Sequence, residues 1–432
     1  MKQNYLKPSE LIIPITLVAF LCSGVTFLDG IFNTTTRWFF LAVLILFLVS
    51  YCWSSVICIL YHPLFKIVLI YAFWIFLSIA WSLVPQISFY KSCIFVCMSM
   101  FMMSAGYSWI IRHNYRQSCD FLWPIVIISL YSSLMGINSE KITTISEYYQ
   151  GLVSGSNHLG FLLAISSCWL VWRIYLARFK HNYIFVLYII LFSVTLYYLF
   201  LSHSRSSLLI FIATVLSMFL ALNRVEKWLW YISFFFMLCA TIYNFSPSLN
   251  YQINQYIFKP GVGRGVVRGD GMVILQSREE VWKESYNKAI DGGMFGAGNG
   301  VFIDYDFSGK IGPSLSTGEY GREQGNSQYA IIEQIGFVGF FLYLILISGI
   351  IGVIFFGLRN AQFKIDRAVI GLFGGVILGL LGQSVFEAWW VAQSSPESAT
   401  FWMFLGALLA AIRRSKFASM NQNLSIDTQK NH

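Results

Sequence analysis

Arg205 lies in the stretch LSHSRSSLL (201–209), directly before an apolar run. Its neighbours Ser204, Ser206 and Ser207 add hydroxyl groups, and a helix start at this point would add unpaired backbone N–H groups. A guanidinium with such neighbours is well suited to binding phosphate through paired hydrogen bonds. The alternative is an interfacial arginine that extends toward lipid headgroups. The residue types alone leave both interpretations open.

A second arginine, Arg278, is near the start of SREEVWKESYNKAI (277–290). The spacing of this stretch predicts a short helix with Trp282 and Tyr286 on one side, ended by the glycine-rich turn GGMFGAGNG (292–300). Taken alone, an arginine in such a position is more often a solvated charge than a ligand.

Two more polar groups stand at the entry to apolar runs: Asn157-His158 in SGSNHLGFLL (154–163), and Asn326 to Gln328 in GNSQYAIIEQIGFVG (325–339). A lone histidine such as His158 is more often a satisfied polar residue than a base. No external group of residues has the spacing of metal ligands, so no metal and no cofactor is expected.

The composition indicates which class of protein positions these residues. Only 11% of the 432 residues are charged, while 57% are hydrophobic. So few charges cannot cover the surface of a soluble protein, so we expect an all-α polytopic membrane protein. Apolar runs of roughly 17–25 residues predict about twelve transmembrane helices. They lie near 11–32, 38–60, 65–83, 93–111, 121–137, 158–177, 183–201, 206–222, 228–246, 335–358, 368–386 and 400–412.

The distribution of lysine and arginine predicts the orientation, because cytoplasmic loops carry an excess of both. With the N-terminus inside, the inner segments hold 17 of these residues, and the short outer loops hold four: Arg37, Lys91, Lys141 and Arg205. The inner set is Lys2, Lys7, Lys66, Arg112, Arg116, Arg173, Arg178, Lys180, Arg224, Lys227, Arg359, Lys364, Arg367, Arg413, Arg414, Lys416 and Lys430. Both termini are therefore predicted to be cytoplasmic.

This orientation divides the chain into four parts. Residues 1–246 hold predicted helices one to nine, and 247–328 form one large periplasmic or extracellular loop that contributes to the site. Residues 329–414 hold helices ten to twelve, and 415–432 are a cytoplasmic tail. None of the eight cysteines lies in the large loop, so no disulfide framework is expected there.

The stretch GNSQYAIIEQIGFVG resembles the signature of the O-antigen ligase and polymerase superfamily, with Asn326, nine residues, and then Gly336-Phe-Val-Gly339. Other stretches follow in the family's order. SGSNHLG resembles its Asn-x-x-Gly entry to a middle span, and SHSRSS its Ser-Arg-Gly step. The stretch 277–302 resembles its Arg-x-x-x-Trp and Gly-x-Gly-x-x-x-Phe elements, and 386–406 is similar to the closing segment of some members. The resemblance covers about residues 150–410.

The resemblance implies a GT-C-like membrane glycosyltransferase at the outer face of the bacterial inner membrane. Its donor would be an undecaprenyl-pyrophosphate-linked glycan and its acceptor another glycan or a lipid A core. Membrane lipids, a chain-length regulator and a flippase are the other expected partners, and nucleic acid is not one. Guanidinium groups can stabilise a departing pyrophosphate without a metal. We therefore predict Arg205, Arg278 and Asn326 as catalytic residues. The predicted substrate-binding residues are Asn157, His158, Ser204, Trp282, Gln328 and Glu323.

One position departs from the family's pattern. The ligases carry a histidine where this chain has Gly325, and no histidine lies in 247–328. In the ligases that histidine is proposed to help activate the acceptor hydroxyl. Its absence favours a polymerase of O-antigen or exopolysaccharide, with a ligase of lipopolysaccharide as the alternative. Glu319, Glu323 and His158 are the candidate bases. A polysaccharide or lipid transporter is the rival from another class, although the spans carry few charges and show no repeat.

Overall fold

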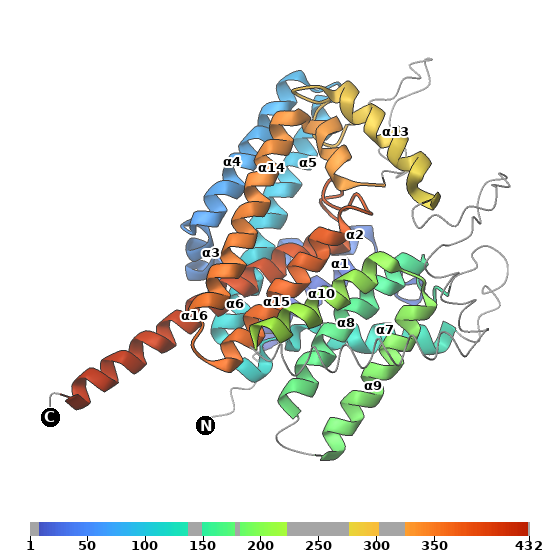
Figure 1. Ribbon diagram of the computed structural model, residues 1–432. Helices are drawn as coiled ribbons and strands as arrows, with labels where there is room; N and C mark the ends of the chain where they lie inside the picture. Colours follow the sequence, from blue (N-terminus) through green and yellow to red (C-terminus); the bar gives the residue numbers. More distant parts are fainter. Residues whose placement is uncertain (1–7, 137–148, 178–181, 223–275, 302–324, 431–432) are drawn as a thin grey trace.

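The computed structural model describes residues 8–136, 149–177, 182–222, 276–301 and 325–430, with only the course of the helix given for 276–280 and from 419 onwards. Within these ranges the chain forms α-helices, short 3₁₀ turns and one π-helical turn, and no strand (Figure 1). The α-helices are α1 (Ile12–Leu21), α2 (Thr34–Tyr51), α3 (Trp53–Leu60), α4 (Pro63–Leu77), α5 (Pro85–Cys97), α6 (Met103–Arg112), α7 (Trp123–Met135), α8 (Ser156–Ala177), α9 (Asn182–Leu201), α10 (Arg205–Ala221), α13 (Gln276–Gly292), α14 (Ser327–Asn360), α15 (Lys364–Gln383) and α16 (Pro396–Lys430).

Seven helical stretches of the described chain are long and apolar enough to cross a membrane. They are Pro63–Trp81, Pro85–Arg112, Tyr115–Met135, Ser156–Ala177, Tyr183–Leu201, Ser327–Asn360 and Lys364–Gln383. Two other apolar helices, α1 and α10, are shorter. The described residues are therefore all-helical, as predicted, and their long apolar helices support a membrane protein. The number twelve remains a prediction, and the span expected at 228–246 lies outside the described residues.

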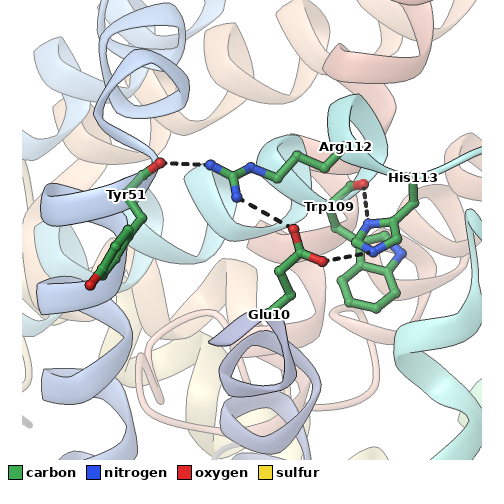
Figure 2. A network of polar contacts seen from close by, with 5 residues as sticks. All are labelled: Glu10, Tyr51, Trp109, Arg112 and His113. Carbon is green, nitrogen blue, oxygen red and sulfur yellow. Dashed lines mark hydrogen bonds and ion pairs between the residues drawn. The ribbon is translucent and has the colours of Figure 1, made fainter. Parts of the chain in front are cut away.

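The span predicted at 38–60 is bent in the structure. It consists of α2 and α3, which are bent by 95° relative to each other. Cys52 at the bend has the non-helical angles φ −129° and ψ 24°. A helix break leaves carbonyl groups without intrahelical partners. Arg112 Nη2 donates to one of them, the carbonyl of Tyr51, at 2.6 Å (Figure 2).

The same arginine belongs to a polar network that joins the start of the described chain to the end of α6 (Figure 2). Glu10 is paired with Arg112 and with His113, each at 3.4 Å. His113 also contacts the carbonyl of Trp109 at 2.9 Å and stacks on the Trp109 ring. Glu10, Arg112 and His113 belong to segments that the charge distribution predicts to be cytoplasmic.

Other contacts separate the two predicted faces in the same way. Predicted inner residues meet one another: Arg173 pairs with Asp120 at 2.5 Å, and Arg414 donates to the carbonyl of His113 at 2.8 Å. Predicted outer segments also contact one another: Tyr149 N–H donates to the carbonyl of Leu201 at 3.3 Å. Residues assigned to one side thus contact residues assigned to the same side.

Glycines bring α15 against α10, the helix that begins with Arg205. Gly371, Gly375 and Gly379 recur every four residues, so they form one stripe of α15. A β-carbon at Gly375 would lie 2.5 Å from Thr214 Cα, and one at Gly379 would lie 2.5 Å from Ile210 Cα. Small residues at this spacing allow two helix backbones to pack closely in a membrane. The stripe therefore determines where the N-terminus of α10 lies.

A second glycine arrangement joins α14 to the turn after α13. Gly336 interrupts α14 with φ 73° and ψ 178°, in the left-handed region that favours glycine. A β-carbon there would collide with the carbonyl of Met294. Across this break, Ala297 N–H donates to the carbonyl of Glu333 at 2.9 Å, and Phe337 N–H donates to the carbonyl of Gly293 at 3.1 Å. These backbone hydrogen bonds attach the turn 292–300 to residues 333–338 of α14.

Candidate functional site

Arg205 is the first residue of α10, after a sharp turn from the end of α9. His203 in this turn has φ 51°, which is uncommon for a residue other than glycine. Ser204 is the N-cap residue, but its hydroxyl contacts the hydroxyl of Ser207 at 2.7 Å and makes no capping bond to the backbone. The first N–H groups of α10 therefore receive no cap from Ser204. A helix start of this kind attracts anions.

The segment that links α15 to α16, residues 384–395, passes directly by this helix start. Ser206 Oγ donates to Glu387 Oε1 at 2.9 Å. The carbonyl of Glu387 in turn accepts a hydrogen bond of 2.8 Å from Ser327 Oγ at the first position of α14. Glu387 thus connects the N-termini of two helices that are far apart in the sequence. Trp390, which is 4% exposed, anchors the segment through its Nε1 bond of 3.2 Å to Tyr71 Oη.

Asn326 and Gln328 are engaged at the start of α14. Asn326 Oδ1 caps the helix by accepting from the N–H groups of Gln328 and Tyr329, at 2.7 and 3.1 Å. Asn326 Nδ2 donates to the carbonyl of Val385 at 3.0 Å. Gln328 Nε2 donates to Ser384 Oγ at 3.0 Å. Both side chains therefore position the 384–395 segment, and their direct contact with a substrate remains a prediction.

Trp282 of α13 contacts both the residue before α14 and the 384–395 segment. Its Nε1 donates to the carbonyl of Gly325 at 3.0 Å, and its ring lies 6.0 Å from that of Phe386. A β-carbon at Gly325 would lie 2.8 Å from Val281 Cγ1 and 3.1 Å from Trp282 Cδ1. The space that a histidine would need at position 325 is thus filled by α13. Arg278 is one helical turn before Trp282 on α13, and its side chain is outside the described part.

Helix α8 joins the site through its own first turn. A β-carbon at Gly160 would lie 2.9 Å from both Ser202 Oγ and Ser204 Oγ, so α8 is closely packed against the turn before Arg205. His158 points elsewhere, because its Nε2 contacts the carbonyl of Leu21 at 2.6 Å. Asn157 is exposed. The structure thus brings the stretches 154–160 and 202–207 together, although it turns His158 toward α1.

Two of the predicted bases, Glu319 and Glu323, lie outside the described residues. A third carboxyl group, that of Glu387, was missed in the sequence prediction. Its stretch FEAWW was noted only for similarity to a closing segment, and its contact with Ser206 joins residues 181 positions apart. The available signal was a glutamate directly after the apolar run 368–386, because a carboxyl group at a membrane span usually has a specific role.

In chemical terms, four segments distant in the sequence meet at this place: the α10 start, the α14 start, α13 and the 384–395 segment. The combination offers hydroxyl groups and helix N-termini for an anion next to one carboxyl group for a proton, and Arg205 is the first residue of α10. Among the described residues, no group of three or more His, Cys, Asp or Glu side chains could hold a metal ion. In comparisons with known proteins, no family model and no curated protein matches the chain.

Proposed function

We propose that the chain is a membrane glycosyltransferase that polymerises an undecaprenyl-pyrophosphate-linked oligosaccharide at the outer face of the inner membrane. The observation that carries the proposal is the meeting of α10, α13, α14 and the 384–395 segment around Arg205 and Glu387. These are the segments in which the resemblance to the O-antigen ligase and polymerase superfamily lies, and they come together through contacts that no local pattern requires.

In this reaction the donor sugar carries the lipid pyrophosphate on its anomeric carbon. The acceptor hydroxyl oxygen forms a bond to that carbon, the bond from the carbon to the phosphate oxygen breaks, and the hydroxyl proton passes to a base. Negative charge develops on the departing pyrophosphate. Arg205, Arg278 and the start of α10 supply positive charge there, and such preorganised donors lower the barrier most where charge develops.

The proposal assigns the base role to Glu387. Its carboxyl group contacts Ser206 at the start of α10, its backbone carbonyl contacts Ser327 at the start of α14, and the histidine of the ligases has no counterpart at Gly325. The bond from Ser206 orients the carboxyl group, as expected of a base held by a neighbouring donor. A weak base suffices here because pyrophosphate is a good leaving group.

Glycan analysis of a strain from which the gene is deleted tests the proposal. Surface chains limited to a single repeat, restored to full length by the wild-type gene, are the expected result. Unchanged glycans and unchanged export would contradict a glycosyltransferase.

The second candidate is the ligase that joins a finished polysaccharide to lipid A core. The close packing of Val281 and Trp282 on Gly325 disfavours the ligase, because a ligase would need its histidine at position 325. In the deletion strain a ligase predicts full-length polymer that lacks its anchor, whereas a transporter predicts lipid-linked units that accumulate inside the cell.

A further inference from the structure

A second polar cluster, which the proposed mechanism does not use, lies at the other end of the 384–395 segment. Arg37 of α2 donates from Nη1 to the carbonyl of Ser394 at 3.4 Å. Lys91 of α5 precedes Ser92, whose hydroxyl group accepts from Asn299, and Asn299 accepts in turn from Gln393, the neighbour of Ser394. The Arg37 and Lys91 side chains are both half-buried. Arg37 is also in the second turn of α2, near the positive end of the helix dipole. Positive charge is thus concentrated at this place.

The glycine-rich turn after α13 forms one wall of this basic cluster. Gly300 packs so closely on Lys91 that a β-carbon would lie 2.6 Å from Lys91 Cγ. Asn299, which is 3% exposed, donates from Nδ2 to Ser92 Oγ at 3.2 Å and accepts at Oδ1 from Gln393 Nε2 at 3.0 Å. The walls of the cluster are therefore built from side chains held in fixed positions by hydrogen bonds.

Some buried polar atoms of the cluster have no partner. Gln334 is 1% exposed, and its Oε1 accepts from Gly300 N–H at 2.8 Å, while its Nε2 makes no hydrogen bond. The buried Nε of Arg37 likewise makes none. A buried donor without a partner is destabilising, so these donors favour a bound acceptor. Gln393 Oε1 is an unpartnered acceptor in the same cluster, suitable for a hydroxyl group.

The carboxyl group nearest in the sequence to Gln393 is that of Glu397, at the start of α16. It interacts with its own backbone and with Ser395, within the cap of its helix. Ser395 Oγ accepts from the N–H of Ser398 at 3.1 Å in the same cap. Glu397 is therefore engaged locally, and Arg37 contacts a neutral carbonyl.

We infer that the basic cluster of Arg37, Lys91, Asn299, Gln334 and Gln393 binds the diphosphate of a second lipid-linked glycan, the acceptor. This inference rests on the proposed function. A polymerase joins two glycans that each carry a polyprenyl diphosphate, so it has two diphosphates to hold. A ligase has only one such substrate, because its acceptor is a lipid A core. A polymerase therefore requires two cationic sites, and the proposed donor site at Arg205 and Arg278 and the basic cluster would supply them.

The distance between the proposed catalytic site and the basic cluster is compatible with one acceptor molecule that reaches both. Glu387 at the first place and Ser394 at the second are seven residues apart on one segment. A chain of that length spans at most about 25 Å. An oligosaccharide of a few sugars can bridge such a distance, with its diphosphate in the basic cluster and its far hydroxyl group near Glu387. Its sugar hydroxyls would meet Gln393 on the way.

The test counts the polyprenyl diphosphates that one protein molecule binds. Undecaprenyl diphosphate without sugars is titrated into the purified protein in phosphatidylcholine nanodiscs, and bound lipid is counted by native mass spectrometry. Wild type should bind two molecules. The Arg37→Gln/Lys91→Gln variant should keep one and lose the other, with affinity at that place reduced roughly ten- to a hundredfold. The Arg205→Gln/Arg278→Gln variant should show the reciprocal loss.

The control is Lys66→Gln/Arg359→Gln, which removes two exposed charges far from both places in the sequence and should bind two molecules. A thermal melt of each variant in nanodiscs verifies that it is folded, and single Lys91→Gln replaces the double variant if that one is not. Added phosphatidylglycerol should not displace either diphosphate.

The outcomes separate the two proposals. Two diphosphates bound with wild-type affinity by the Arg37→Gln/Lys91→Gln variant would overturn the inference. So would displacement of the second molecule by phosphatidylglycerol, which would make the cluster a headgroup site. The inference would also be wrong if the wild type bound one molecule and only the Arg205→Gln/Arg278→Gln variant lost it. The proposed function would then stand. No binding at all would count against both.

Discussion

Arg205 and Arg278 are the residues on which the proposed reaction most depends. If they hold the donor pyrophosphate, each contact strengthens as the leaving group gains charge. Arg205→Ala or Arg278→Ala should then cost on the order of 2–4 kcal/mol of transition-state stabilisation, or roughly a hundredfold or more in rate. Lysine should restore little, because an ammonium group does not reproduce the planar fork of guanidinium. Polymer length in cells with matched membrane levels is the measurement.

Arg359→Ala is the matched control for these variants, because Arg359 is an exposed arginine in the last turn of α14. It should leave polymer length unchanged. If Arg205 only anchors the helix to lipid headgroups, its lysine variant should be nearly silent. Normal chains from both alanine variants would remove the pyrophosphate assignment.

Glu387 is tested by a change that keeps its shape. Glu387→Gln retains an oxygen that can accept from Ser206 Oγ, but it loses the ability to take a proton at that place. General base catalysis contributes about 10²–10⁴-fold, so the rate should fall by roughly that factor while donor binding persists. The measurement is the rate of chain extension against pH, which should lose its acidic limb in the variant.

Glu284→Gln, an exposed residue of α13, is the control for the loss of one carboxylate. A Glu387→Gln protein that extends chains at the wild-type rate and with the wild-type pH profile would rule out the base role.

At the scale of elements, the glycine stripe of α15 makes a separate prediction. Gly375→Val should separate α15 from α10, because its side chain would press on the Thr214 backbone. Overpacking of this kind typically costs about 1–3 kcal/mol. It should also move Arg205 relative to Glu387, so activity should fall further than the membrane level of the protein does. Gly352→Val in α14 is the control, since a β-carbon there has no neighbour within 4 Å. Equal activity per molecule in both variants would show that the stripe does not position the site.

The elements also show how far the sequence alone could predict the structure. The length of the apolar runs predicted most of the described spans, because burial in a membrane acts on each helix separately. Spacing also placed Trp282 and Tyr286 on one side of α13, and both meet the start of α14. The bend at Cys52 was not predicted, because no proline or glycine marks it and Arg112 takes the freed carbonyl from far along the chain. The pairing of 292–300 with 333–338 and the contact of Glu387 with Ser206 depend on tertiary packing, which periodicity does not contain.

For the whole molecule, the network around Glu10 and the Arg37 cluster lie at opposite predicted faces, which the site proposals require. The orientation is tested with Ser314→Cys in a variant whose native cysteines are replaced. Because 17 lysines and arginines are assigned to the inner segments and four to the short outer loops, position 314 should be labelled by a membrane-impermeant maleimide in intact cells. Lys416→Cys should react only after the cells are permeabilised. The reverse pattern would place Arg205, Glu387 and the basic cluster on the cytoplasmic face. Undecaprenyl-linked glycans assembled outside would then be out of reach, and both the polymerase proposal and the acceptor site would fail together.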